Sequence, residues 1–197
     1  MTELKEKFVI PAPPDEVWPL MSDPAVVAAC IPGAELTELT PDGAHRGKVT
    51  FKFGPTVAVF RGEARLTYDH PVKRCLIEAR GIDQKGASRA RARFELEARG
   101  ADTTNVTLEG GFEIAGPLEM FASAGGVHVA RVLLAEFATN IARAIEQRRM
   151  GEVTAGGDGV PEQAPAASGT KILGRALLDG ARNRIGKMSG RNDKGSA

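Results

Sequence analysis

Residues 117–149 read PLEMFASAGGVHVARVLLAEFATNIARAIEQRR, and this stretch decides the fold. Its apolar residues recur every three, four, seven or eight positions, which is the periodicity of one face of an α-helix. Pro117 suits the first turn of such a helix, where its missing N–H breaks no intrahelical hydrogen bond. The stretch therefore predicts one long helix whose apolar face has to be covered by the rest of the chain.

In the chain before this helix, apolar and polar residues alternate as they do in β-strands. Seven strand-like runs precede it, and the clearest is Ser88 to Ala98, in which small or apolar residues alternate with arginine and glutamate. Such alternation gives one buried and one solvated face. Two short helices are expected after the first run, at Asp15 to Met21 and at Ala25 to Cys30, the second capped by Asp23. The other runs are residues 4–10, 36–40, 45–53, 56–69, 75–80 and 104–115.

This order of elements predicts an α+β domain over residues 1–149, in which a curved antiparallel sheet wraps around the C-terminal helix. Protein interiors contain few voids, so small inward residues leave space that either bulky helix residues or a ligand must fill. The Gly125-Gly126 pair inside the helix fits close packing, a kink or an apolar ligand. The small residues expected to face inward are Ala58, Ala64, Ala79, Ala90, Ala92, Ala98 and Gly110.

The composition changes after the long helix. Residues 150–169 predict a flexible linker, residues 170–189 a basic amphipathic helix, and residues 190–197 a disordered end. From residue 170 onward the net charge is +5, which leaves about −4 of the overall +1 for residues 1–169. A basic amphipathic helix suits an anionic membrane surface, and packing on a partner protein or on its own domain are the alternatives. The expected membrane-binding residues are Lys171, Leu173, Arg175, Leu177, Leu178, Arg182, Ile185 and Met188.

Catalytic residues are not evident, and binding is the favoured activity. The sequence has no metal-binding cluster, nucleophile elbow or phosphate-binding glycine loop. Of the three histidines, only His128 on the long helix is a candidate to point into the interior, and a structural role is favoured for it there. Arg89, Arg91 and Arg93 alternate along one strand face without interleaved aromatic residues, so we expect a solvated, ion-paired surface and no nucleic-acid binding.

Features of the sequence that report on compartment favour a cytoplasmic protein. The N-terminal residues are charged and form no signal region, and no run reaches the roughly 18 apolar residues of a membrane span. Cys30 and Cys75 are too few for a disulfide framework and are expected to be reduced core residues.

Several short motifs in residues 1–149 form a set that resembles a known family. The most specific is Cys30-Ile31-Pro32-Gly33-Ala34. The others are Phe8-Val9-Ile10 with Pro14, Val17-Trp18, Asp23-Pro24, Lys48 with Gly54-Pro55, and Phe60-Arg61-Gly62 with Ala64. In these motifs the chain resembles the CoxG-like family of carbon monoxide dehydrogenase subunits, within the START-like (SRPBCC) superfamily. It departs from the usual pattern at Gly116-Pro117-Leu118-Glu119-Met120 and at Ser123-Ala124-Gly125-Gly126.

The resemblance implies a helix-grip (START/Bet v1-like) fold and a non-catalytic accessory to a molybdenum hydroxylase such as carbon monoxide dehydrogenase. We expect a carried lipophilic quinone of the menaquinone or ubiquinone type, no covalently bound cofactor and no metal. We also expect peripheral association with the inner face of the cell membrane. An assembly or recruitment factor without a small ligand is the alternative, and an enzyme like the polyketide cyclases or hydrolases is less favoured.

The residues expected to bind the ligand are mostly aromatic or aliphatic. A plain core role is the open alternative for all of them except Gly125. They are Phe51, Phe53, Phe94, Phe112, Phe121, Gly125, Val129 and Leu133.

Overall fold

The structure is a computed structural model that describes residues 1–53 and 56–151. Its elements follow the order that the sequence predicts, with two short helices after the first strand and the long helix last. The elements are β1 (Thr2–Ile10), α1 (Pro14–Met21), α2 (Pro24–Cys30), β2 (Ala34–Leu39), β3 (His45–Phe53), β4 (Thr56–Asp69), β5 (Arg74–Asp83), β6 (Arg89–Gly100), β7 (Thr104–Ala115) and α3 (Glu119–Arg149).

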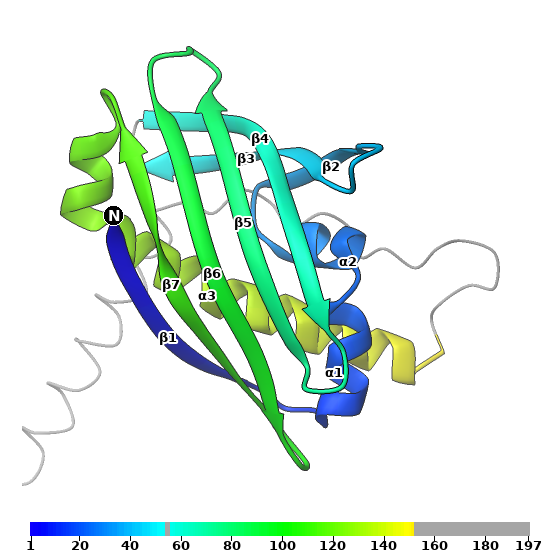
Figure 1. Cartoon of the computed structure of the whole chain (residues 1–197). Helices are drawn as coiled ribbons and strands as arrows, with labels where there is room; N and C mark the ends of the chain where they lie inside the picture. Colours follow the sequence, from blue (N-terminus) through cyan, green and yellow to red (C-terminus); the bar gives the residue numbers. More distant parts are fainter. Residues whose placement is uncertain (54–55, 152–197) are drawn as a thin grey trace, which may run out of the picture.

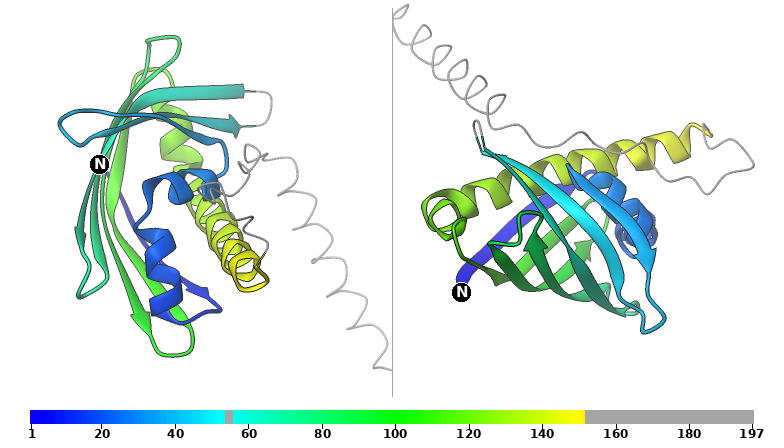
Figure 2. Two further views of the ribbon diagram at one scale, coloured as in Figure 1. Left: turned by 90° about the vertical axis from the view of Figure 1, so that its right-hand side faces the viewer. Right: turned by 90° about the horizontal axis from the view of Figure 1, so that it is seen from above.

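Within the described residues the strands form one antiparallel sheet in the order β1-β7-β6-β5-β4-β3-β2. β1 closes one edge by pairing with β7, from Thr2 opposite Phe112 to Ile10 opposite Thr104. β2 forms the other edge, with a register shift between Leu36 and Glu38. α3 lies behind the sheet in Figure 1, and the sheet curves around it in Figure 2. The predicted helix-grip architecture is confirmed.

Local chemistry explains where the helices begin. Asp23 caps α2, because its Oδ1 accepts hydrogen bonds from the backbone N–H groups of Ala25 at 2.9 Å and Val26 at 3.3 Å. α3 begins at Glu119, two residues later than the sequence suggests. Before it, the N–H of Leu118 donates to Ser88 Oγ at 3.1 Å, which ties the start of α3 to the start of β6.

The closed hydrophobic core lies at one end of the sheet. The C-terminal half of α3 supplies Phe137 and Ile141, which are 6% and 0% exposed, and Phe137 packs edge-on against Phe8 of β1. α1, α2 and the nearby ends of β1, β5, β6 and β7 complete this core. By contrast, Val129 and Leu133 in the N-terminal half of α3 are only half-buried. The core therefore closes around one half of α3 and leaves the other half partly open.

No helix in the described part of the chain is long and apolar enough to cross a lipid bilayer.

The position of the core predicts unequal costs for similar truncations of α3. Ile141→Ala should lower the free energy of unfolding by about 2–5 kcal/mol, because a fully buried side chain leaves a cavity. Leu133→Ala should cost about 1 kcal/mol or less, because this side chain is only half-buried. Urea unfolding of both variants checks this, and equal losses would show that the core extends along the whole helix.

The two cysteines make stability depend on alkaline pH. Both are free and buried, and burial raises the pKa of the Cys30 and Cys75 thiols from 9.0 to about 11. Between pH 9 and 11 the unfolded chain therefore releases thiol protons that the folded chain retains, and stability falls as the pH rises through this window. The urea midpoint should drop from pH 8 to pH 10.5 by more in the wild type than in the Cys30→Ala/Cys75→Ala variant. Equal drops in both proteins would assign the effect to other groups.

Candidate functional site

The inner face of the sheet, which faces α3, carries a band of small residues across its central strands. The residues of the band are cross-strand partners in two adjacent rows. The first row is Gly47, Gly62, Gly81 and Ala90, and the second is Ala64, Ala79 and Ala92. A helix packed on a sheet is about 10 Å away and normally meets large side chains there. The small-residue band supplies none, and its residues Ala64, Ala79 and Ala92 are only partly buried.

Aromatic side chains stand around the small-residue band. Phe51 packs edge-on against Phe60, with ring centroids 6.2 Å apart. Phe112 of β7 lies opposite Ala92, and Phe94 follows Ala92 by two residues on the same face. Phe60 is 5% exposed, whereas Phe51, Phe94 and Phe112 are half-buried. Described residues thus leave part of an apolar, aromatic surface in contact with solvent.

The N-terminal half of α3 comes close to this surface at Gly126. A Cβ atom on Gly126 would lie 2.9 Å from Cζ of Phe112, whereas a Cβ atom on Gly125 would have nothing within 4 Å. The two glycines therefore differ in role. Gly126 lets the helix approach Phe112, and Gly125 borders open space.

The polar side chains on the inner face differ in whether they have a hydrogen-bond or ion-pair partner. His45 lies opposite Ala64 at one end of the second row, and its buried Nδ1 has no hydrogen-bond partner among the described residues. Glu6 of β1 is paired with Arg131 of α3 at 2.6 Å. Burial raises the pKa of Tyr68 well above its usual value, so this phenol stays neutral at physiological pH. His45 is thus one polar group beside the band that could still bind a partner.

The expectation that His128 lies near the interior is wrong. Its side chain is exposed, because α3 turns Gly126, Val129 and Leu133 toward the sheet, and a residue two positions from Gly126 then points away. In residues 1–53 and 56–151, no three His, Cys, Asp or Glu side chains come close enough to hold a metal ion.

The structure gathers most of the expected ligand residues around the small-residue band. Phe51, Phe94 and Phe112 lie on the inner face of the sheet, while Gly125, Val129 and Leu133 lie on α3. Phe53 is the last residue of β3, and Phe121 lies in the first turn of α3. The expected membrane-binding residues, from Lys171 to Met188, lie outside the described residues.

Sequence reasoning missed His45 and the alignment of Gly47, Gly62 and Gly81. A signal was present, because each glycine occupies an inward position of a predicted strand. Their alignment into one row depends on the register between strands, which spacing along the chain does not reveal. Alternation also places His45 on the inner face, but spacing along the chain does not show that its Nδ1 would be buried without a hydrogen-bond partner in the described residues.

Comparisons with known proteins agree with this fold. The model of the CoxG family of carbon monoxide dehydrogenase subunits matches residues 7–146. A conserved protein from Geobacillus kaustophilus is similar, with a TM-score of 0.66 and 17% identity over 74% of this chain and 95% of that one. No curated protein sequence matches the chain.

Two further solved structures are more distant. The di-domain ARO/CYC protein BexL from the BE-7585A biosynthetic pathway has a TM-score of 0.50 and 18% identity over 72% of this chain and 46% of that one. A START superfamily protein from Mycobacterium smegmatis has a TM-score of 0.49 and 16% identity over 75% of this chain and 99% of that one. At 18% identity the likeness to BexL is one of fold alone.

The two glycines of α3 should respond differently to the same substitution. Gly125→Ala should stabilise the protein by up to about 1 kcal/mol, because alanine favours the helix and meets no neighbour. Gly126→Ala should be the less stable of the two by up to about 1 kcal/mol, because the ring of Phe112 has to move. Urea unfolding of the pair measures the difference. An equal gain for both would mean that α3 does not press on Phe112.

Proposed function

Because the chain belongs to the CoxG family of carbon monoxide dehydrogenase subunits, we propose that it is a non-catalytic accessory protein that carries a lipophilic quinone. In this proposal it takes the quinone from the membrane and presents it to a molybdenum hydroxylase of the carbon monoxide dehydrogenase type. The observation that carries the proposal is the small-residue band beneath half-buried aromatic rings. An apolar surface of this kind, partly open to solvent, is suited to a ligand.

The shape and chemistry of this surface fit a quinone in three ways. A flat ring system can slide between the small-residue band and α3, where larger side chains would block it. Phe51, Phe94 and Phe112 offer aromatic faces and edges for ring contacts. His45 can hydrogen-bond a quinone carbonyl at the end of the band, which would satisfy its Nδ1.

The proposed route to the membrane uses the basic amphipathic segment at residues 170–189. Its cationic side chains would contact anionic headgroups while its apolar stripe enters the interface. Residues 150–169 would act as the tether between this segment and the domain. The protein would then sit peripherally on the inner face of the cell membrane.

Filling the small-residue band should block quinone uptake. Ala79 of β5 and Ala92 of β6 are cross-strand partners that lie side by side on the inner face. The Ala79→Leu/Ala92→Leu variant therefore places two large side chains where the ring would lie. Thr67→Leu, at an exposed outward position of β4, is the matched control. Each full-length protein is incubated with menaquinone-loaded liposomes, the liposomes are removed, and the quinone left with the protein is quantified. We expect uptake to fall about tenfold or more in the double variant, which corresponds to about 1.4 kcal/mol, and to be unchanged in the control.

A second arm separates ligand binding from membrane binding. Leu177→Glu/Leu178→Glu should reduce uptake from liposomes and leave uptake from detergent micelles unchanged. A wild-type protein that takes up no quinone from either source would contradict the carrier proposal and favour an assembly or recruitment factor.

A further inference from the structure

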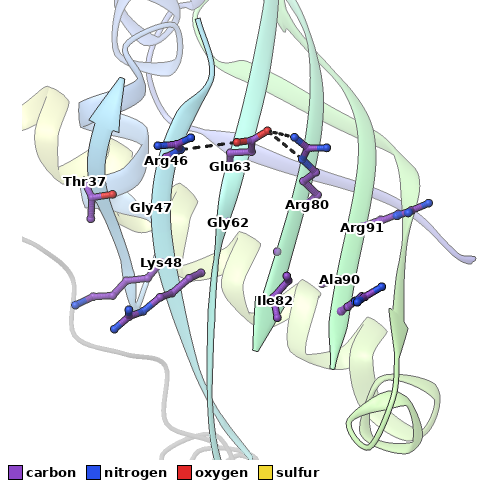
Figure 3. Close-up of a pocket in the computed structure, with 13 residues that line it drawn as sticks. Thr37, Arg46, Gly47, Lys48, Gly62, Glu63, Arg80, Ile82, Ala90 and Arg91 are labelled. Atoms are coloured by element: carbon purple, nitrogen blue, oxygen red, sulfur yellow. Dashed lines mark hydrogen bonds and ion pairs between the residues drawn. The ribbon is translucent and has the colours of Figure 1, made fainter. Parts of the chain in front are cut away.

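The outer face of the sheet, on the side away from α3, contains a groove of about 670 Å³. Its floor is the backbone of the Gly47, Gly62, Gly81 and Ala90 row, and long charged side chains form its two walls. Figure 3 shows Arg46, Glu63 and Arg80 side by side in one wall. We call this feature the basic groove. Its charged residues are Arg46, Lys48, Arg61, Glu63, Arg80, Arg89 and Arg91.

Like charges face one another across the strands of the basic groove. Lys48 lies directly opposite Arg61, and Arg80 lies directly opposite Arg91. Directly opposed like charges destabilise an antiparallel sheet. A solvated sheet surface selected only for stability would not place two such pairs next to each other.

The rest of the outer face does not share this pattern. Arg93 is ion-paired with Glu78 on the neighbouring strand, and Arg74 is bonded to Glu97 at 3.1 Å. The ion-paired surface expected for the arginines of β6 is therefore correct for Arg93. Arg89 and Arg91 are exposed, and neither has an ion-pair partner among the described residues.

The acidic groups near the basic groove do not balance its charge. Glu63 is ion-paired with two arginines, Arg80 at 2.6 Å and Arg46 at 3.9 Å. Lys48 is paired with Glu35, and Arg46 also contacts Glu38.

Arg61, Arg89 and Arg91 thus remain as cations without an ion-pair partner in the described part of the chain. Glu113 lies opposite Arg91 in the sheet register, without an ion pair between them. Ile82 lies between Arg61 and Arg89 in the sheet, opposite both of them. Its side chain is exposed and offers an apolar surface to a bound partner.

We propose that the basic groove is a docking site for an extended acidic segment of a partner protein. Five of its six cations are arginines, whose planar guanidinium groups bind carboxylates in bidentate fashion. The groove is recessed between two rows of side chains, so a chain can lie in it, whereas a flat lipid surface would touch only the tips of the walls. It lies on the opposite face of the sheet from the small-residue band, so both sites can be occupied at once. This proposal does not rest on quinone binding.

The test uses the full-length protein and a fluorescein-labelled octaglutamate peptide, with binding followed by fluorescence anisotropy at low ionic strength. Arg61→Gln/Arg89→Gln/Arg91→Gln removes the unpaired cations of the basic groove. Arg93→Gln/Arg99→Gln/Arg148→Gln is the matched control, because it removes the same charge from exposed positions outside the groove. We expect peptide binding to weaken by about tenfold or more in the first variant and by about twofold or less in the control. The first variant should also melt at the same or a higher temperature, because like-charge repulsion is relieved.

Three results would overturn the proposal. One is an equal loss of peptide affinity in both triple variants, which would show that the peptide responds only to the net charge of the protein. Another is a lowered melting temperature of the groove variant, which would give these arginines a structural role. The third concerns flotation with vesicles of phosphatidylcholine and phosphatidylglycerol. If the groove variant loses vesicle binding while it keeps the peptide, the site belongs to a lipid surface.

Discussion

The packing of the C-terminal half of α3 against one end of the sheet is the constraint on which the rest of the structure depends. Phe137, Ile141 and Ile145 are buried there between α1, α2 and the strands, and they hold a helix much longer than this core. The N-terminal half of α3 is then positioned over the sheet without being sealed against it. Gly126 fixes how close it comes to Phe112. A closely packed end therefore supports a partly open end, and a binding surface is well placed when a packed scaffold holds the elements that carry it.

The two faces of the sheet are specialised for different chemistry at the same place. The row of Gly47, Gly62, Gly81 and Ala90 belongs to the small-residue band on the inner face and also forms the floor of the basic groove on the outer face. On the inner face the small residues and the half-buried aromatic rings around them form an apolar surface that is partly open to solvent. On the outer face the neighbouring residues are long cations that suit an acidic partner. One row of small residues thus brings an apolar surface and a charged groove to within one sheet thickness of each other.

Much of this architecture could be predicted from the sequence, because alternation and helical periodicity are local signals. The order of elements, the inward alanines of β6 and the cap at Asp23 all follow from residues close together in the chain. The pairing of β1 with β7, the row of three glycines and the like-charge pairs of the basic groove depend on register between strands, which the sequence does not display. The lack of a partner at His45 Nδ1 also depends on neighbours from other strands, whereas His128 was placed wrongly because the sequence did not show which side of α3 meets the sheet. The family was recognisable from short motifs such as Cys30-Ile31-Pro32-Gly33, which do not require that information.

Native mass spectrometry of the full-length protein purified from its own host tests the central claim most directly. The claim is that the open half of the inner face holds a lipophilic quinone. The account predicts one quinone per chain, released and identified by solvent extraction. The account would be contradicted by protein that is purified without bound quinone and that still binds none after incubation with quinone-loaded liposomes.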